Sequence, residues 1–237
     1  MQAGGVIDSR RVEENVHDVR GRIETAARRA GRDPSTVTLV AVTKEVPPDV
    51  VTWGSRAGLR DFGENYVDEL AQKRPSAPDA TWHFIGTLQS RTAPRVAELA
   101  GVVHSAVPGH ALERVARRAE ERGVELPALV QIDQAGRGTG VPPGDAERAV
   151  AAVLDLHGVR PVGLMTLPPP PSRPEDSRPY FASLRQLRDD LRARYEGIVE
   201  LSMGMSLDYE IAVEEGATMV RVGTALFGPR PGASSER

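Results

Sequence analysis

The sequence contains no cysteine among its 237 residues. Disulfide bonds, thiolate metal sites and a cysteine nucleophile are therefore excluded, and the composition is compatible with a reducing cytosol. An excess of charge of one sign is also missing, because 30 lysines and arginines face 33 aspartates and glutamates. We therefore expect no overall field that would draw the protein to nucleic acid or to an anionic membrane.

Long apolar runs are absent as well. No segment approaches the roughly 18 uninterrupted apolar residues of a membrane-spanning helix. The N-terminal stretch MQAGGVIDSRRVEENV turns polar early and has no apolar core of signal-peptide length. We expect a cytoplasmic protein that contacts neither membranes nor nucleic acid.

A helical pattern opens the chain, with apolar residues three or four positions apart at Val12, Val16, Val19, Ile23 and Ala27. This spacing places them on one face of a helix over about residues 9–31, with Ser9 as its cap and Gly31 at its end. At the other end of the chain, residues 230–237 are expected to form a disordered tail.

Short strand-like runs then alternate with helical patterns, and the runs occupy residues 38–43, 60–64, 82–86, 101–106, 128–133, 160–167, 199–204 and 219–224. Alternation of strand and helix predicts parallel strands joined by right-handed crossovers. Eight such units favour an α/β fold, a single-domain (β/α)8 TIM-type barrel over residues 1–237 with an extra N-terminal helix. The proline-rich stretch at 167–179 is either a surface loop or a wall or lid over the barrel mouth.

The first predicted strand, LVAVT, ends on Lys44. Active groups in this type of barrel lie at the C-terminal ends of the strands, where we also expect Asn65, Gln89, Asp133, Thr166, Ser206 and Thr224. A lysine in that position is either a nucleophile that forms a Schiff base with an aldehyde or a side chain that extends to solvent. Its position alone leaves both interpretations open.

The last two units carry groups suited to an anion. LSMGMS, residues 201–206, puts two serines and a glycine at a strand-to-helix turn, and VRVGTALFG adds Gly223 and Thr224, with Arg221 inside the strand. Backbone N–H groups and hydroxyls at a helix N-terminus bind phosphate, which barrels of this type hold after strands seven and eight. Together with Lys44, these residues describe a pocket for a phosphorylated aldehyde.

The runs LVAVTK, FGENYVDE, WHFIGTLQS, VVHSA, GLMTL and LSMGMSLDYEIAVEEGATMVRVGTALFG together resemble the pyridoxal phosphate homeostasis protein family, from about residue 9 to 229. The resemblance implies a relative of the barrel of bacterial alanine racemase that binds pyridoxal 5'-phosphate (PLP) through an internal aldimine. By motif, Lys44 would be the PLP lysine, Asn65 would line the mouth and Arg221 would face the pyridine nitrogen. The phosphate would be held by Ser206, Gly223 and Thr224.

The resemblance also implies a function. Members of the family are regarded mainly as PLP carriers or regulators in PLP homeostasis, without an established catalytic turnover. An arginine beside the pyridine nitrogen disfavours the pyridinium, so PLP would be a weak electron sink, which suits binding more than chemistry. We expect PLP and PLP-dependent apo-enzymes as partners, and a monomer, with a dimer left open.

Two catalytic alternatives remain. A PLP-dependent racemase or lyase would need proton-transferring groups on both faces of the ring, and the tyrosines offer no obvious candidate: Tyr66, Tyr180, Tyr195 and Tyr209. An aldolase would use Lys44 without any cofactor.

Other motifs receive simpler interpretations. GRGTG lacks the spacing of a nucleotide-binding loop and is expected to be a strand-to-helix connection. His83 and His104 lie on neighbouring predicted strands without an evident third ligand, which favours hydrogen-bonded histidines over a metal site. Trp82 and Phe84 are expected to pack the barrel against its helices. The chain departs from the family pattern at Arg91–Thr92, at AGRGTG (135–140) and at EVPP (45–48), which alters the surface around the mouth.

Overall fold

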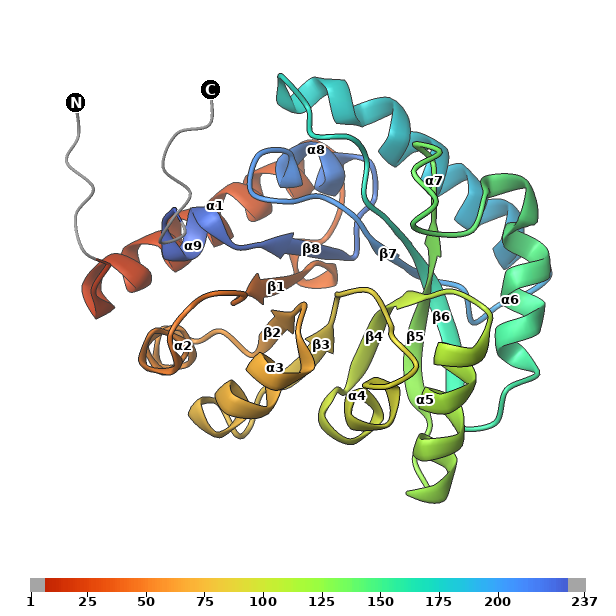
Figure 1. The fold of residues 1–237 in the computed structure, drawn as a ribbon. Coiled ribbons are helices and arrows are strands. Elements are labelled where there is room, and N and C mark those ends of the chain that lie inside the picture. The colour runs from red at the N-terminus through yellow and green to blue at the C-terminus, as the bar shows by residue number, and fades with distance from the viewer. Residues whose placement is uncertain (1–6, 230–237) are drawn as a thin grey trace.

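The computed structural model describes residues 7–229, and its eight parallel strands close into a barrel in chain order (Figure 1). The strands are β1 (Thr38–Val42), β2 (Asp61–Glu64), β3 (Thr81–Phe84), β4 (Val102–Ala106), β5 (Leu126–Ile132), β6 (Val159–Thr166), β7 (Glu200–Ser202) and β8 (Met219–Val222). Each predicted run overlaps one strand, and β8 pairs with β1 to close the ring. The predicted (β/α)8 barrel is confirmed.

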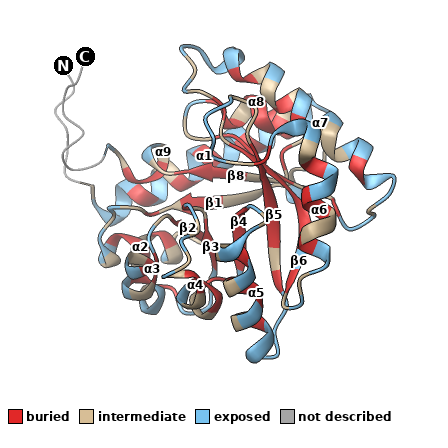
Figure 2. Ribbon diagram, turned by 45° about the vertical axis from the view of Figure 1, so that its right-hand side comes forward, coloured by how far each residue is buried: buried red, intermediate tan, exposed pale blue. Residues whose placement is uncertain are grey.

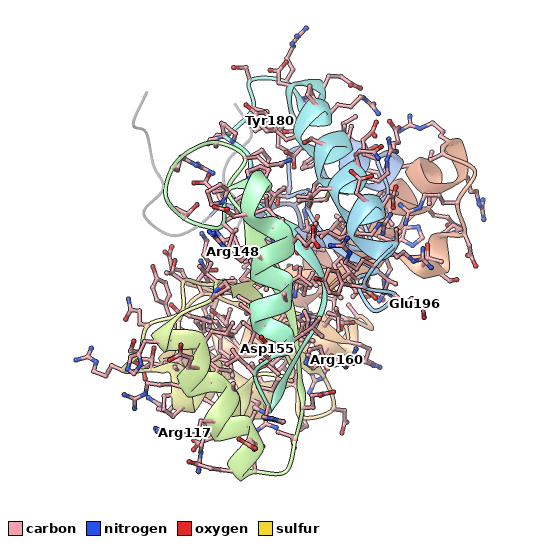
Figure 3. All side chains as sticks on the ribbon, turned by 90° about the vertical axis from the view of Figure 1, so that its right-hand side faces the viewer. Arg117, Arg148, Asp155, Arg160, Tyr180 and Glu196 are labelled. Atoms are coloured by element: carbon pink, nitrogen blue, oxygen red, sulfur yellow. The ribbon has the colours of Figure 1, made fainter. Side chains whose placement is uncertain are left out.

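Helices alternate with the strands and form the outer layer. They are α1 (Ser9–Arg29), α2 (Pro48–Arg56), α3 (Val67–Lys73), α4 (Ala93–Leu99), α5 (His110–Glu121), α6 (Ala146–Leu154), α7 (Arg178–Arg192), α8 (Tyr209–Glu214) and α9 (Thr224–Phe227). Four short 3-10 turns accompany them: η1 (Pro34–Thr36), η2 (Arg74–Ser76), η3 (Pro143–Asp145) and η4 (Pro174–Ser177). Charged side chains such as Arg117 on α5 and Arg148 on α6 project from this outer layer (Figure 3).

The N-terminal helix α1 follows the predicted apolar face, because all five of the spaced apolar residues are buried. Its cap is Asp8 and not Ser9: the Asp8 carboxylate accepts a hydrogen bond from the Arg11 N–H at 2.8 Å. A carboxylate is favoured there because it satisfies a free N–H and faces the positive end of the helix dipole. Gly31 ends the helix as predicted, with a left-handed φ of 67°.

α1 also completes the outer layer of helices. It packs against α2 on one side and against α8 and α9 on the other, so segments from the two ends of the chain lie side by side (Figure 1). The short α9 leaves an opening in the ring after β8. The extra N-terminal helix fills that opening.

The strands are buried along most of their length, and the exposed residues lie on the outer faces of the helices (Figure 2). This pattern is typical of a parallel barrel, whose strands are covered on both sides. Trp82 and Phe84 belong to the core between barrel and helices, as predicted, and the Trp82 ring stacks on Phe62 with centroids 5.3 Å apart. A smaller apolar cluster comprises Val102, Leu129, Val162 and Met165.

Two further points bear on the sequence predictions. The predicted tail at 230–237 lies outside the described residues. Within residues 7–229, none of the helices has the length and apolar character needed to cross a membrane.

Candidate functional site

A cavity of about 420 Å³ opens at the C-terminal ends of β1, β2 and β8. All six residues that the sequence predicted for a cofactor site line it: Lys44, Asn65, Ser206, Arg221, Gly223 and Thr224. The remaining lining is mainly apolar and comes from Val42, Val46, Ile85, Leu167, Pro170, Pro171, Met205, Leu207, Phe227 and Gly228. A concave apolar cavity with a few convergent polar groups is the usual form of a small-molecule site.

Not every residue expected at the mouth reaches this cavity. Gln89, Asp133 and Thr166 are not among its lining residues. The Asp133 carboxylate turns back on its own loop, where it accepts hydrogen bonds from the N–H groups of Ala135 at 3.2 Å and Gly138 at 2.6 Å. The Thr166 hydroxyl is buried and donates to the Ile132 carbonyl at 3.0 Å.

The proline-rich stretch forms part of the cavity wall, through Leu167, Pro170 and Pro171. Arg137, in the loop after β5, donates hydrogen bonds from Nη2 to the carbonyls of Leu167 and Pro168. The GRGTG segment is thus a strand-to-helix connection, as predicted, and it also anchors this wall. Of the two interpretations of residues 167–179, the geometry supports the wall.

Ser206 and the start of α9 form a small polar corner. Ser206 Oγ accepts hydrogen bonds from the backbone N–H groups of Gly223 at 3.2 Å and Ala225 at 3.3 Å. The Thr224 side chain is exposed at the same edge of the cavity. A Cβ atom on Gly223 would lie 3.2 Å from the Val42 carbonyl oxygen, so glycine allows this close approach of β8 and β1. Because Ser206 Oγ accepts these two bonds, its hydroxyl proton, like that of Thr224, remains available to donate to an anion.

Arg221 lies on β8 and is only 3% exposed, although it lines the cavity. Its Nη2 donates to the Thr166 carbonyl at 2.9 Å, and its Nη1 donates to Ser202 Oγ. Burial lowers its pKa to about 10, so the guanidinium remains a cation at neutral pH. Ser202 lies in β7, within the predicted strand run 199–204, and is fully buried.

Lys44 is half-buried at the cavity. The sequence has only one other lysine, Lys73, because the remaining basic residues are arginines. Lys73 is buried and bonds to three oxygen atoms: the Thr43 carbonyl at 2.5 Å, Glu64 Oε1 at 2.7 Å and Glu69 Oε2 at 2.5 Å. Lys44 is therefore the lysine whose amine is open to a ligand in the cavity.

The buried Lys73 supports the turn that carries Lys44. It joins β1, β2 and α3, because Thr43 directly follows β1, Glu64 is the last residue of β2 and Glu69 lies in the first turn of α3. The Thr43 hydroxyl donates to Glu64 Oε1 at 2.6 Å. Burial raises the pKa of Glu64, and the bonds from Lys73 and Thr43 oppose that shift.

The residue after Lys44 has an unusual backbone. Glu45 adopts a φ of 62°, which is uncommon for a residue with a side chain. Its N–H donates to Glu69 Oε2 at 2.8 Å, the oxygen that also accepts from Lys73. Lys73, Glu64 and Glu69 therefore fix the turn that presents Lys44. Sequence reasoning missed all three, although Glu69 and Lys73 stand four apart on a helix.

The two strand histidines are hydrogen-bonded, as predicted. His83 Nδ1 lies 2.8 Å from His104 Nε2, and His83 Nε2 lies 3.0 Å from Asp61 Oδ1. In the part of the chain that the structure describes, no group of three or more histidine, aspartate or glutamate side chains could hold a metal ion.

Comparison with known proteins places the chain in a family. A family model described as alanine racemase, N-terminal domain, matches residues 7–231. The pyridoxal phosphate homeostasis protein of Aquifex aeolicus is 39% identical over 222 residues, which cover 92% of this chain and 97% of the relative. That of Pseudomonas aeruginosa is 42% identical over 226 residues, which cover 92% and 96% of the two chains. The chain belongs to the pyridoxal phosphate homeostasis protein family.

A solved structure supports this membership. PipY of Synechococcus elongatus, determined with PLP bound, is 33% identical to this chain, with a TM-score of 0.80. The likeness covers 92% of this chain and all of PipY. The barrel that carries the Lys44 cavity is therefore shared with PipY.

Proposed function

We propose that this protein binds PLP covalently through Lys44 Nζ and acts in cytoplasmic PLP homeostasis, supplying PLP to PLP-dependent apo-enzymes without catalysing a reaction of its own. The observation that carries the proposal is the cavity. It holds the accessible lysine, Lys44, together with the hydroxyls of Ser206 and Thr224 and the guanidinium of Arg221. The PLP named in the PipY structure and in the family name fits the same chemistry.

The residues present suit each part of PLP. A lysine amine is the nucleophile that an aldehyde requires, and Lys44 offers one at the cavity. The hydroxyls of Ser206 and Thr224, which line the same edge of the cavity, supply donors for a phosphate. Asn65 lines the side next to Lys44. When bound, PLP supplies an electron sink whose strength depends on the protonation of its ring nitrogen.

Arg221 limits that electron sink. Its cationic guanidinium faces the cavity and cannot accept a proton, so it disfavours a second positive charge on a ring nitrogen beside it. Asp or Glu would have the opposite effect. The arginine therefore supports a protein that holds PLP over one that uses PLP for carbanion chemistry.

The lining of the cavity supports the same conclusion. Among the described residues that line it there is no tyrosine and no histidine. Tyr66 is 58% exposed, and Tyr180 lies at the first turn of α7 in the outer layer of helices (Figure 3). A racemase or lyase would need a proton donor and acceptor at the ring, and the cavity presents no tyrosine or histidine for that role.

The test is covalent labelling. The purified protein is mixed with PLP, reduced with borohydride, digested and mapped by mass spectrometry. We expect a visible absorption band before reduction and a single pyridoxyl label on Lys44. With only two lysines in the chain, the assignment is unambiguous. A label on Lys73 or on the N-terminal amine in place of Lys44 would contradict the proposal.

Lys44→Arg is the matched control, since it keeps the positive charge but cannot form the covalent bond. We expect an unchanged circular dichroism spectrum and complete loss of the label. A reducible adduct of wild-type yield in this variant would refute the role of Lys44. Turnover is tested separately with amino acids, and a sustained racemase or lyase rate that requires Lys44 would overturn the non-catalytic part.

A further inference from the structure

A chain of hydrogen bonds runs from the cavity through the interior of the barrel. It starts at Arg221 on β8 and passes to Ser202 on β7, to His104 on β4 and to His83 on β3, and it ends at Asp61 on β2. The four contacts join residues far apart in the sequence. Only closure of the barrel brings them together.

Each end of the chain has a fixed role in hydrogen bonding. An arginine guanidinium can only donate, and an ionised aspartate can only accept. Arg221 Nη1 donates to Ser202 Oγ, and Asp61 Oδ1 lies 3.0 Å from His83 Nε2, which must therefore carry a proton. The direction at both ends is thereby set.

The middle of the chain follows from these ends. If His83 is neutral, its Nδ1 is bare and accepts from His104 Nε2–H at 2.8 Å. The bare His104 Nδ1 then accepts from the Ser202 hydroxyl at 2.8 Å. The other four residues each donate once toward Asp61, so the five residues form a one-way relay with both imidazoles in the Nε2–H form.

The alternative would place a proton on both nitrogens of His83. That imidazolium would be a second cation in the barrel interior, where His83 is 2% exposed and His104 is fully buried. Burial, together with the neighbouring His83 and Arg221, already holds the pKa of His104 well below its ordinary value. The neutral relay avoids adding a buried charge.

The relay also gives Arg221 a connection to a negative charge. The Arg221 guanidinium is buried, and among residues 7–229 no carboxylate lies within ion-pair distance of it, although the charge of the buried Asp208 opposes the lowering of its pKa. The Asp61 side chain is 28% exposed and lines a second cavity, of about 450 Å³, near the N-terminal ends of β1 and β2. The buried cation is thus linked through neutral groups to a carboxylate that solvent can reach.

From this arrangement we infer that Asp61, His83, His104 and Ser202 are positioning residues for Arg221. They hold its guanidinium at the cavity by a one-way relay whose outer end lies at the opposite side of the barrel. The effect of the relay on bound PLP rests on the proposed function. The relay itself does not.

The first test uses the full-length protein without PLP. Long-range proton–nitrogen NMR correlation at neutral pH distinguishes protonated from bare imidazole nitrogens. We expect His83 and His104 both with Nε2–H and bare Nδ1, and the three other histidines of the chain serve as references. A doubly protonated His83, or a His104 protonated at Nδ1, would overturn the relay.

The second test examines transmission along the chain. Asp61→Asn keeps a side chain of the same shape but removes the charge, and Asp79→Asn removes a charge from an exposed site just before β3. We expect the nitrogen resonances of His104, which does not contact Asp61, to move in Asp61→Asn and to remain fixed in Asp79→Asn. Unmoved resonances in both variants would show that Asp61 has only a local role and refute the relay.

The third test adds PLP. Ser202→Ala removes the hydroxyl that Arg221 contacts, and we expect a shifted absorption maximum of bound PLP and an affinity about tenfold weaker. Wild-type absorption and affinity would show that the relay does not position Arg221. If wild-type protein forms no Lys44 adduct while the NMR result is as expected, the proposed function fails and the relay stands.

Discussion

Lys73 Nζ lies 2.7 Å from Glu64 Oε1, and the side chains are 3% and 0% exposed. This buried pair sits behind the turn that carries Lys44, because Lys73 also binds the Thr43 carbonyl. Two lysines thus have opposite roles: one is locked by three acceptors, and the other faces the cavity. The pair makes the presentation of Lys44 depend on contacts that join β1, β2 and α3.

Removing one partner of this pair should be costly. Lys73→Met leaves the Glu64 carboxylate buried without its cation, so we expect the free energy of unfolding to fall by about 3–5 kcal/mol, measured by urea denaturation. Adding Glu64→Gln should recover part of the loss, since the uncompensated charge disappears.

Arg95→Met is the control for Lys73→Met, because Arg95 pairs with Asp68 in a contact whose side chains are 51% and 83% exposed. It should change the unfolding free energy little. Equal losses in Lys73→Met and Arg95→Met would argue against a buried structural ion pair.

Glu64 should make stability depend on pH. Burial raises its pKa above the ordinary 4.5, so the native protein binds a proton more tightly than the unfolded chain does. The stabilisation that protonated Glu64 contributes is complete below about pH 4.5 and is lost as the pH rises through the raised pKa of the folded state. Urea unfolding across this window should show a steeper fall for wild type than for Glu64→Gln.

Glu196→Gln is the matched control for this pH series, because Glu196 projects from the surface (Figure 3). It should keep the wild-type pH slope. If Glu64→Gln also keeps that slope, the pKa of Glu64 does not differ between the folded and unfolded states.

The hydroxyls of Ser206 and Thr224 should matter for phosphate only. Replacing both with alanine removes two donors at the polar corner. We expect the affinity for PLP, measured by equilibrium dialysis, to fall by about tenfold or more. Pyridoxal, which lacks the phosphate, should bind the double variant as it binds wild type. Equal weakening of both ligands would instead indicate damage to the cavity.

Arg137 should control access to the site. Arg137→Ala removes the hydrogen bonds to the Leu167 and Pro168 carbonyls, so the proline-rich wall loses its anchor. We expect hydroxylamine to remove bound PLP several times faster than from wild type, and the rate is measured as the loss of visible absorption. Arg148→Ala, on the exposed face of α6 (Figure 3), should keep the wild-type rate. Identical rates in the two variants would show that Arg137 does not limit access to the cavity.

The sequence by itself determined the order of elements, and it predicted which residues line the cavity at the barrel mouth. Hydrophobic periodicity is a local property, so the α1 face and all eight strands could be predicted. Parallel strands present their C-terminal ends at one mouth, and this rule alone predicts that Lys44, Ser206 and Thr224 lie together. The prediction of Ser9 as helix cap was wrong, because the cap depends on which side chain reaches the Arg11 N–H, and Asp8 does.

Only the tertiary structure decided which side chains meet inside the barrel. Ser202 falls in a predicted strand, but only the closed barrel places its hydroxyl between His104 and Arg221. Gln89 and Asp133 follow strands as Lys44 does, yet they do not line the cavity. The contacts of Lys73 and of the relay depend on strand register and barrel closure. These join residues from different strands, and local sequence patterns carry no record of that pairing.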